Sequence, residues 1–315
     1  MGKFFTISVL SAMLAVAPCV HAAPAAQADT IGPLLGGIMY DQGTPYNDLC
    51  PSLNGEGKSV TGCVATAMAQ VMRYYKFPAV GHGSSSYTSS QGAVTYNFDN
   101  HPFDWDNMLE TYTRSNYSLQ QGQAVATLML ACGASVNMTY SADGSGAQTD
   151  KAQAALKNYF YYSNAKLAET TDQNVLVNDW VYTIQENLDN GRPVIYAGSS
   201  GSFAGHCFVV DGYTIDAEGT YWFHCNWGWS GLDNDWYKIT NFAPPSDGTG
   251  NNYSGYRNSM VYNIYPDGGT AVEEVTHSME IDANMPIYNI FGVQVRADQL
   301  QHGNIYIQNG QKIIF

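Results

Sequence analysis

Apolar residues between positions 63 and 75 recur at steps of three and four, the spacing of one face of an α-helix. The recurring positions are Val64, Ala67, Met68, Val71 and Met72. Gly62 precedes this run and Pro78 follows it, and both residue types are common at helix boundaries. The pattern therefore predicts a helix with Cys63 at or within its first turn.

The remaining pattern divides the chain into a helical half and a β half. Further helices are predicted over residues 123–132, 150–159 and 177–190. Runs rich in β-branched and aromatic residues follow, separated by turns that contain glycine. The predicted strands begin at Pro193, His206, Thr220 and Asp235, and a further strand covers residues 260–265. This order predicts an α+β fold, with helices first and an antiparallel sheet second.

The N-terminal 22 residues have the layout of a secretory signal peptide. One early lysine precedes a mainly apolar stretch, and Val20-His21-Ala22 resembles a cleavage site. Pro18 and His21 interrupt the run, which therefore does not suit a membrane span of about 20 apolar residues. Cys19 allows a lipoprotein as the alternative, although Pro18 fits a lipidation site poorly. We expect a secreted, cell-surface or periplasmic protein without a membrane span.

A boundary is expected at Pro266-Asp-Gly-Gly-Thr, which separates residues 23–265 from a tail over residues 266–315. The tail begins with an acidic linker and ends with two short apolar runs. Phe291-Gly292 and Asn309-Gly310 are typical of hairpin turns within these runs. A segment of this size buries little core by itself, so it either docks on the main domain or acts as a sorting signal.

Composition excludes several classes of partner and ligand. The formal net charge is −14, from 13 basic and 27 acidic residues, which disfavours nucleic acid and anionic membranes as partners. With 23 tyrosines and few charges, the chain is typical of a compact exported protein. Neither a CxxC pair nor a Cys/His cluster with metal-ligand spacing is present, so we expect no metal and no cofactor.

The cysteines suggest nucleophilic chemistry. Five of the six remain after signal removal, and an odd number leaves at least one thiol unpaired. A thiol at a helix N-terminus is favoured as thiolate, and a histidine can serve as its base. His206 opens an apolar strand and could meet Cys63 across a cleft, while Asn226 could orient the imidazole and Trp227 could shield it. The alternative is a buried apolar cysteine and a packed histidine, the reading we give to Cys132 and to His82, His101, His224, His277 and His302.

Four blocks of sequence extend this hypothesis. Residues 61–78 (TGCVATAMAQVMRYYKFP) resemble the nucleophile segment of the streptopain family, papain-fold cysteine peptidases of bacteria. Residues 40–47, 205–212 and 226–231 resemble further blocks of the same family, in the same order. The resemblance covers about residues 30–265, including a glycine-rich loop at 248–256.

The resemblance implies a papain-like two-lobe fold with its site in the cleft between the lobes. It implies that Cys63 is the nucleophile, that His206 is the general base and acid, and that Gln42 completes an oxyanion hole with the Cys63 backbone N–H. Asn226 and Trp227 match the orienting and shielding positions; the alternative for Asn226 is a strand-end residue that caps a turn. The implied activity is that of an endopeptidase preferring an apolar residue one position before the cleaved one. A thiol acyltransferase or amidase, or a non-catalytic peptide-binding surface protein, are the alternatives.

The chain departs from the family in three respects. A long inhibitory propeptide is usual, but only a short stretch precedes the Gln42 block, so we expect a separately encoded inhibitor protein or a very short N-terminal peptide. Cys207 stands where alanine is usual, and strand alternation predicts that it faces away from the cleft beside Cys225, as a disulfide or as two buried thiols. The tail lies outside the resemblance and is similar to C-terminal segments of exported Bacteroidetes proteins, which suggests sorting.

Overall fold

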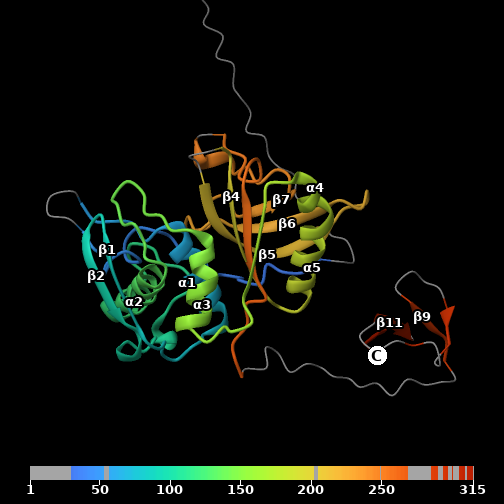
Figure 1. Ribbon diagram of the computed structural model, residues 1–315, viewed down its shortest axis with the longest axis horizontal. Helices are drawn as coiled ribbons and strands as arrows, with labels where there is room; N and C mark the ends of the chain where they lie inside the picture. Colours follow the sequence, from blue (N-terminus) through green and yellow to red (C-terminus); the bar gives the residue numbers. More distant parts are fainter. Residues whose placement is uncertain are drawn as a thin grey trace, which may run out of the picture.

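The computed structural model describes residues 30–52, 57–201, 205–248 and 250–268, and the C-terminal stretches 285–289, 294–296, 300, 305–308 and 311–314. The predicted signal peptide lies outside these ranges. The main body has two lobes, the helical one formed by the earlier part of the chain and the sheet by the later part (Figure 1). This confirms the predicted α+β order.

Three helices and a hairpin form the first lobe. The helices are α1 (Cys63–Tyr75), α2 (Leu119–Ser135) and α3 (Thr149–Tyr159), and the hairpin is β1 (Ser84–Ser89) with β2 (Gly92–Asn97). Short 3₁₀ turns follow at η1 (Phe98–Asn100) and η2 (Trp105–Asn107). α1 and α3 match the predicted segments. α2 begins before the predicted segment because Ser118 and Gln121 form a capping box at its start.

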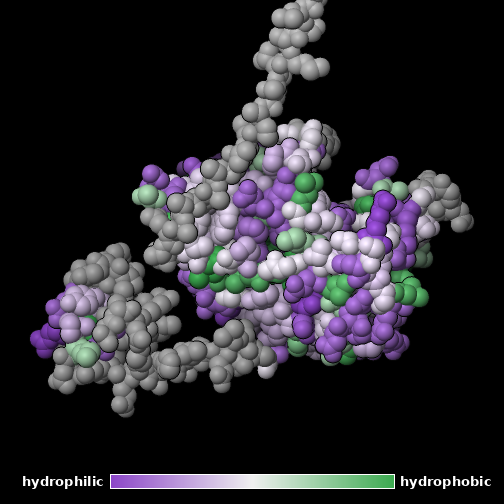
Figure 2. All heavy atoms as spheres, turned by 180° about the vertical axis from the view of Figure 1, so that it is seen from behind, coloured by the Kyte–Doolittle hydropathy of each residue, from purple (hydrophilic) through white to green (hydrophobic). Residues whose placement is uncertain are grey.

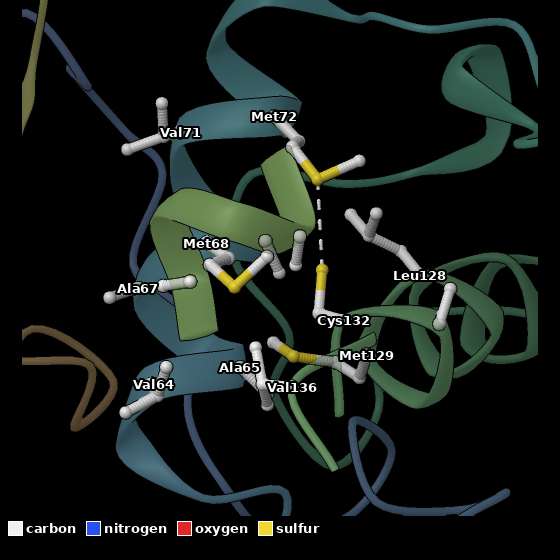
Figure 3. Close-up of a cluster of buried hydrophobic side chains, with 14 of the residues drawn as sticks. Val64, Ala65, Ala67, Met68, Val71, Met72, Leu128, Met129, Cys132 and Val136 are labelled. Atoms are coloured by element: carbon white, nitrogen blue, oxygen red, sulfur yellow. Dashed lines mark hydrogen bonds between the residues drawn. The ribbon is translucent and has the colours of Figure 1, made fainter. Parts of the chain in front are cut away.

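The core of the first lobe is built around α1, which is buried from Val64 to Arg73. Figure 3 shows its side chains packed against those of α2, with the Cys132 and Met72 sulfurs facing each other. The Cys132 thiol lies 3.7 Å from the Met72 sulfur, and Cys132 is fully buried. Cys132 is therefore a packed apolar residue, as predicted.

The second lobe contains one antiparallel six-stranded sheet in the order β3-β8-β4-β5-β6-β7. The strands are β3 (Lys166–Thr170), β4 (Val194–Ser199), β5 (Gly205–Ile215), β6 (Tyr221–Asn226), β7 (Asp235–Tyr237) and β8 (Asn258–Tyr262). A short turn, η4 (Pro245–Asp247), precedes β8. All the strands predicted from Pro193 onward are present, whereas β3 was not predicted.

The sheet separates two apolar cores. One face packs on α1, and the other is covered by α4 (Gln173–Val175), the π-turn η3 (Leu176–Trp180) and α5 (Val181–Asp189). Neighbouring residues of β5 alternate between the cores, with Cys207 and Val209 in the first and Phe208 and Val210 in the second. The lobes therefore share this sheet as their common wall.

The predicted proximity of Cys207 and Cys225 is wrong. Cys225 pairs in register with Val210, not with Cys207, and its side chain lies in the second core. Cys207 lies in the first core, on the opposite face of the sheet. It lines the cavity that contains Cys63, so the prediction that it faces away from the cleft is also wrong. Both cysteines are buried free thiols, so the alternative without a disulfide is the correct one.

The tail forms a separate four-stranded sheet in the order β10-β9-β11-β12. Its strands are β9 (Ile287–Asn289), β10 (Gln294–Val295), β11 (Ile305–Gln308) and β12 (Gln311–Ile314). β9 pairs antiparallel with β10, and β11 with β12, as the hairpin turns predicted. The turn residues 291–292 and 309–310 lie outside the described residues. The domain boundary and the sorting role remain predictions.

One face of the molecule is mainly polar. Figure 2 shows small, separated apolar patches on a largely hydrophilic face. Within the described ranges, none of the helices combines the length and the hydropathy needed to cross a bilayer.

Candidate active site

A cavity of about 750 Å³ receives residues from both lobes. Cys63 contributes from the start of α1, and His206 and Cys207 contribute from the start of β5. Residues 145–149 complete the wall of the helical lobe, and residues 169–171 and 256–259 complete that of the sheet lobe. The predicted nucleophile and the predicted base therefore share one cavity.

Gly62 fixes where α1 begins and thus where Cys63 stands. Its backbone has φ 87° and ψ 141°, in the region that favours glycine. A Cβ at this position would lie 2.7 Å from the Met138 sulfur and 2.9 Å from the Ser145 carbonyl oxygen. The first turn carries no acidic residue, so the positive end of the helix dipole is not neutralised by a neighbouring carboxylate. The helix dipole therefore contributes in favour of a thiolate at Cys63, against the effect of burial.

The imidazole of His206 is oriented by a backbone carbonyl. His206 Nε2 lies 2.8 Å from the Trp227 carbonyl oxygen, and the ring is buried. A carbonyl only accepts hydrogen bonds, so Nε2 carries the proton. Nδ1 is then the basic nitrogen of the ring.

Asn226 does not accept the ring N–H, contrary to the expectation that it orients His206 directly. Its Nδ2 donates to the Ile38 carbonyl oxygen at 2.7 Å, and its Oδ1 accepts the Gly228 N–H at 3.2 Å. Asn226 thus ends β6 as a turn-capping residue, the alternative interpretation. It acts on His206 indirectly, since it fixes the turn that presents the Trp227 carbonyl.

Aromatic rings enclose His206. Trp227 is fully buried, lies 5.9 Å from the imidazole between ring centroids, and donates its indole N–H to the Asp233 carbonyl oxygen. Trp229 approaches more closely, at 4.6 Å, and Tyr253 lies at 5.6 Å. Trp229 and Tyr253 fall within sequence blocks singled out above, but no role was predicted for them. Together the rings keep water from the Nε2 hydrogen bond.

Burial opposes the charged form of both reacting groups. It raises the pKa of the Cys63 thiol, while the N–H groups of Cys207 and Val64 lower that pKa to a smaller extent. It lowers the pKa of His206 to about 4, while the Trp227 hydrogen bond and the Asp247 charge act in the opposite direction. Each group alone therefore favours its neutral form, and a thiolate–imidazolium pair depends on the attraction between the two charges.

The lowered pKa of His206 predicts a stability change with pH. In the unfolded chain the imidazole has a pKa of about 6.5. Between pH 6.5 and about pH 4 the unfolded state therefore binds more protons than the folded state. Stability is therefore lost as the pH falls through this window. Relative to His206→Gln, the wild type is expected to lose at most about 3 kcal/mol of unfolding free energy between pH 7 and pH 4. Urea unfolding at both pH values measures it, and a pH-independent difference between the two proteins would contradict the pKa shift.

Gln42 lies beside the nucleophile segment, where Asp41 holds its backbone. The Gln42 carbonyl oxygen accepts the Thr61 N–H at 3.1 Å. Asp41 accepts the N–H of Gln42 at 2.6 Å and that of Gly43 at 3.1 Å. Its second oxygen accepts the Ser230 hydroxyl at 2.6 Å, which links this loop to the loop that follows β6. Asp41 lies in the sequence block of residues 40–47, but it was not predicted as a functional residue.

Asp41→Ala is expected to reduce kcat because it releases Gln42 and the Ser230 loop together. Misplacement of a positioning loop by about 1 Å can cost about 100-fold, so we expect a loss of about 10- to 100-fold with little change in KM. Steady-state kinetics on a peptide substrate measures this effect. Asp48→Ala is the matched control, because Asp48 is an exposed carboxylate paired with Lys58. Equal kinetics for the two variants would refute the role of Asp41.

The described residues contain no group of three or more His, Cys, Asp or Glu side chains that could hold a metal ion. The chemistry available here is that of a thiol, an imidazole and amide donors. These are the groups needed for nucleophilic attack on a carbonyl carbon.

Comparisons with known proteins show what this chain is similar to. The profile described as "Peptidase C10 family" matches residues 40–237. Streptopain of Streptococcus pyogenes is 34% identical over 245 residues, which cover 71% of this chain and 60% of streptopain. The thiol protease/hemagglutinin PrtT of Porphyromonas gingivalis is 35% identical over 240 residues, or 74% of this chain and 27% of PrtT. The chain thus spans about 60% of the length of the streptopain sequences that it matches.

A solved structure shares the fold. The active wild-type interpain A cysteine protease of Prevotella intermedia superposes with a TM-score of 0.65 at 35% identity. The match covers 75% of this chain and 95% of the chain in that structure. It confirms the papain-like two-lobe fold expected from the sequence blocks.

Proposed function

The chain belongs to the peptidase C10 family, and we propose that it is a cysteine endopeptidase that cleaves peptide bonds through a thioester on Cys63. The observation that carries the proposal is the cavity shared by Cys63 and His206, with His206 Nε2 tied to the Trp227 carbonyl. That bond leaves Nδ1 as the base for the thiol. Loss of casein hydrolysis in Cys63→Ala tests the proposal, as argued in the Discussion.

The reaction proceeds by acyl transfer in two halves. His206 Nδ1 takes the thiol proton, and the Cys63 sulfur attacks the peptide carbonyl carbon. The imidazolium then protonates the departing amine as the C–N bond breaks, which leaves the acyl group on sulfur. In the second half His206 takes a proton from water, the hydroxide attacks the thioester, and the thiolate leaves. The Cys63 backbone N–H and the Gln42 side chain stabilise the oxyanion in both halves.

Gln42→Ala tests this oxyanion role. Removal of one such donor is expected to lower kcat by about 100- to 1,000-fold, with KM nearly unchanged, because the oxyanion forms only in the transition state. Kinetics on a chromogenic peptide measures the effect, with Gln120→Ala on the exposed side of α2 as the control. A loss expressed mainly in KM would assign Gln42 to substrate binding instead.

The proposed substrates are proteins and peptides with an apolar residue one position before the residue whose peptide bond is cleaved. The cavity wall beside Cys63 includes the small apolar residues Val64, Ala147 and Ala197. Two charged residues, Glu169 and Arg257, also line the cavity and both are exposed. A peptide series varied at that position measures the preference, and a selection for acidic or basic residues would overturn it.

Two other activities use the same groups. A thiol acyltransferase would transfer the acyl group to an amine, and an amidase would release ammonia, so product mapping with an added amine separates both from a peptidase. A peptide-binding protein without catalysis would bind substrate and leave it intact. The hydrogen bond that leaves His206 Nδ1 unprotonated favours catalysis, because a protein that only binds peptides does not need a base in its binding site.

Export and control are proposed from the sequence. We place the mature protein outside the cytoplasm after removal of residues 1–22, and we propose that a separate inhibitor protein or a very short N-terminal peptide restrains it. Expression of residues 23–315 tests this proposal. Protein that stays inactive until a larger segment is clipped would contradict control by a separate inhibitor.

A further inference from the structure

The nucleophile has a second thiol beside it. Cys207 lines the same cavity as Cys63, and its backbone N–H faces the Cys63 sulfur and stabilises the thiolate there. The two side chains also interact electrostatically, since a charge on Cys63 disfavours a charge on Cys207. Cys63 also packs against the apolar core that contains Cys207, so the two thiols lie on the same side of the sheet.

The other described thiols are placed elsewhere. Cys225 lies in the core on the opposite face of the sheet, and Cys132 faces Met72 inside the helical lobe. Cys50 is buried in the helical lobe and does not line the cavity. Among the described cysteines, Cys207 is therefore the one placed to react with Cys63.

The two thiols differ in their exposure to solvent. Cys63 is partly exposed at a helix N-terminus, whereas Cys207 is 3% exposed and packs into the core beneath α1. Burial raises the pKa of the Cys207 thiol well above its usual range, so dissolved oxidants react with that thiol slowly. An oxidant therefore reacts with Cys63 first, while Cys207 remains a reduced thiol.

We propose that Cys207 is a resolving thiol, which converts oxidised Cys63 into a reversible Cys63–Cys207 disulfide. The inference rests on the proposed function, because it requires a reactive Cys63. The oxidant is a peroxide: the Cys63 thiolate attacks one oxygen of hydrogen peroxide, the O–O bond breaks, and sulfenic acid and hydroxide form. The Cys207 sulfur then displaces the sulfenic hydroxyl, which leaves as water with the Cys207 proton.

The disulfide has two consequences for an exported peptidase. It blocks the nucleophile, so activity stops while the environment is oxidising. It also consumes the sulfenic acid before a second peroxide produces the irreversible sulfinic acid. A thiol reductant then breaks the S–S bond and restores Cys63, at the cost of oxidation of the reductant.

The test compares wild type with Cys207→Ala and with Cys225→Ala as the matched buried-thiol control. Each active, purified protein is treated with a small excess of hydrogen peroxide, then with dithiothreitol, and casein hydrolysis is measured at each stage. Wild type and Cys225→Ala are expected to lose activity and regain most of it. Cys207→Ala is expected to recover less than about a tenth of its own activity before oxidation, because overoxidation is irreversible.

Non-reducing peptide mapping of the same samples identifies the product. In oxidised wild type we expect the Cys63 and Cys207 peptides to be cross-linked, and in Cys207→Ala we expect Cys63 to gain two or three oxygens. Thermal unfolding of Cys207→Ala and of the closer substitution Cys207→Ser checks that the variants fold. Equal recovery in Cys207→Ala, or oxidised wild type without the cross-link, overturns the inference.

The outcomes separate this inference from the proposed function. Active enzyme that is oxidised at Cys63 without a cross-link refutes the resolving role alone. Folded, reduced enzyme that does not cleave casein refutes the peptidase itself.

Discussion

Replacement of Cys63 by alanine is expected to lower casein hydrolysis at least about 10⁴-fold, because it removes the proposed nucleophile and the second thiol of the cavity, Cys207, is only 3% exposed. Truncation of the thiol at the start of α1 removes no hydrogen bond that holds the helix, since Thr66 N–H and its hydroxyl bind the Gly62 carbonyl oxygen independently. The variant should therefore fold and bind substrate. Casein hydrolysis at equal protein concentration measures the loss.

The matched control is Cys50→Ala, a thiol buried in the same lobe and outside the cavity. It is expected to keep wild-type kcat, with at most a modest loss of stability. If Cys63→Ala retained more than a hundredth of the wild-type rate, a group other than this thiol would carry the reaction.

His206→Ala is expected to cost a similar factor, at least about 10³-fold in kcat, because the thiol then lacks both its base and the proton donor for the leaving amine. The Cys63→Ala, His206→Ala double variant should be no slower than Cys63→Ala alone, since the two groups act as a unit. Single-turnover and steady-state kinetics on one peptide measure both statements.

Another histidine of the sheet provides a control for the loss in His206→Ala. His224 is a second histidine of the same sheet, bound to Asp211 at 2.6 Å and outside the cavity. His224→Ala is expected to reduce stability and to leave kcat near wild type. Additive losses in the double variant would show that Cys63 and His206 do not act together.

Much of this structure could be predicted from the sequence, because the strongest sequence patterns are local. The three- and four-residue spacing after Cys63 predicted α1, and Gly62 marked its start because a side chain there would clash. The glycine-bearing turns beyond residue 192 predicted the strands that carry His206 and Asn226. Cys63 and His206 were candidates because each stands at the start of a clear element, and their roles as nucleophile and base were implied by the resemblance to the streptopain family.

The remaining features depend on register and side-chain direction, which periodicity does not determine. Asn226 stands at the predicted strand end, yet its amide turns to Ile38 and the Trp227 backbone binds the imidazole. Cys207 and Cys225 were expected on one face, but the β5–β6 register sets Cys225 against Val210. A bulge between Val210 and Gly212 shifts that register.

Two polar strands were not predicted from the sequence, for a different reason. β1 is rich in serine and β3 carries charged residues, so neither has the apolar alternation of a half-buried strand. Pairing with β2 and β8 makes them strands, which is a tertiary effect. Asp41 was missed similarly, because its importance lies in contacts with Gln42, Gly43 and Ser230.

Covalent labelling of folded, reduced protein by the epoxide inhibitor E-64 at neutral pH, located by peptide mapping, tests the pairing of Cys63 with His206 most directly. The account predicts one inhibitor molecule per chain, attached to Cys63 in the wild type and nearly absent from His206→Ala. Folded wild-type protein whose Cys63 stays unlabelled, or His206→Ala labelled as fast as wild type, would contradict it.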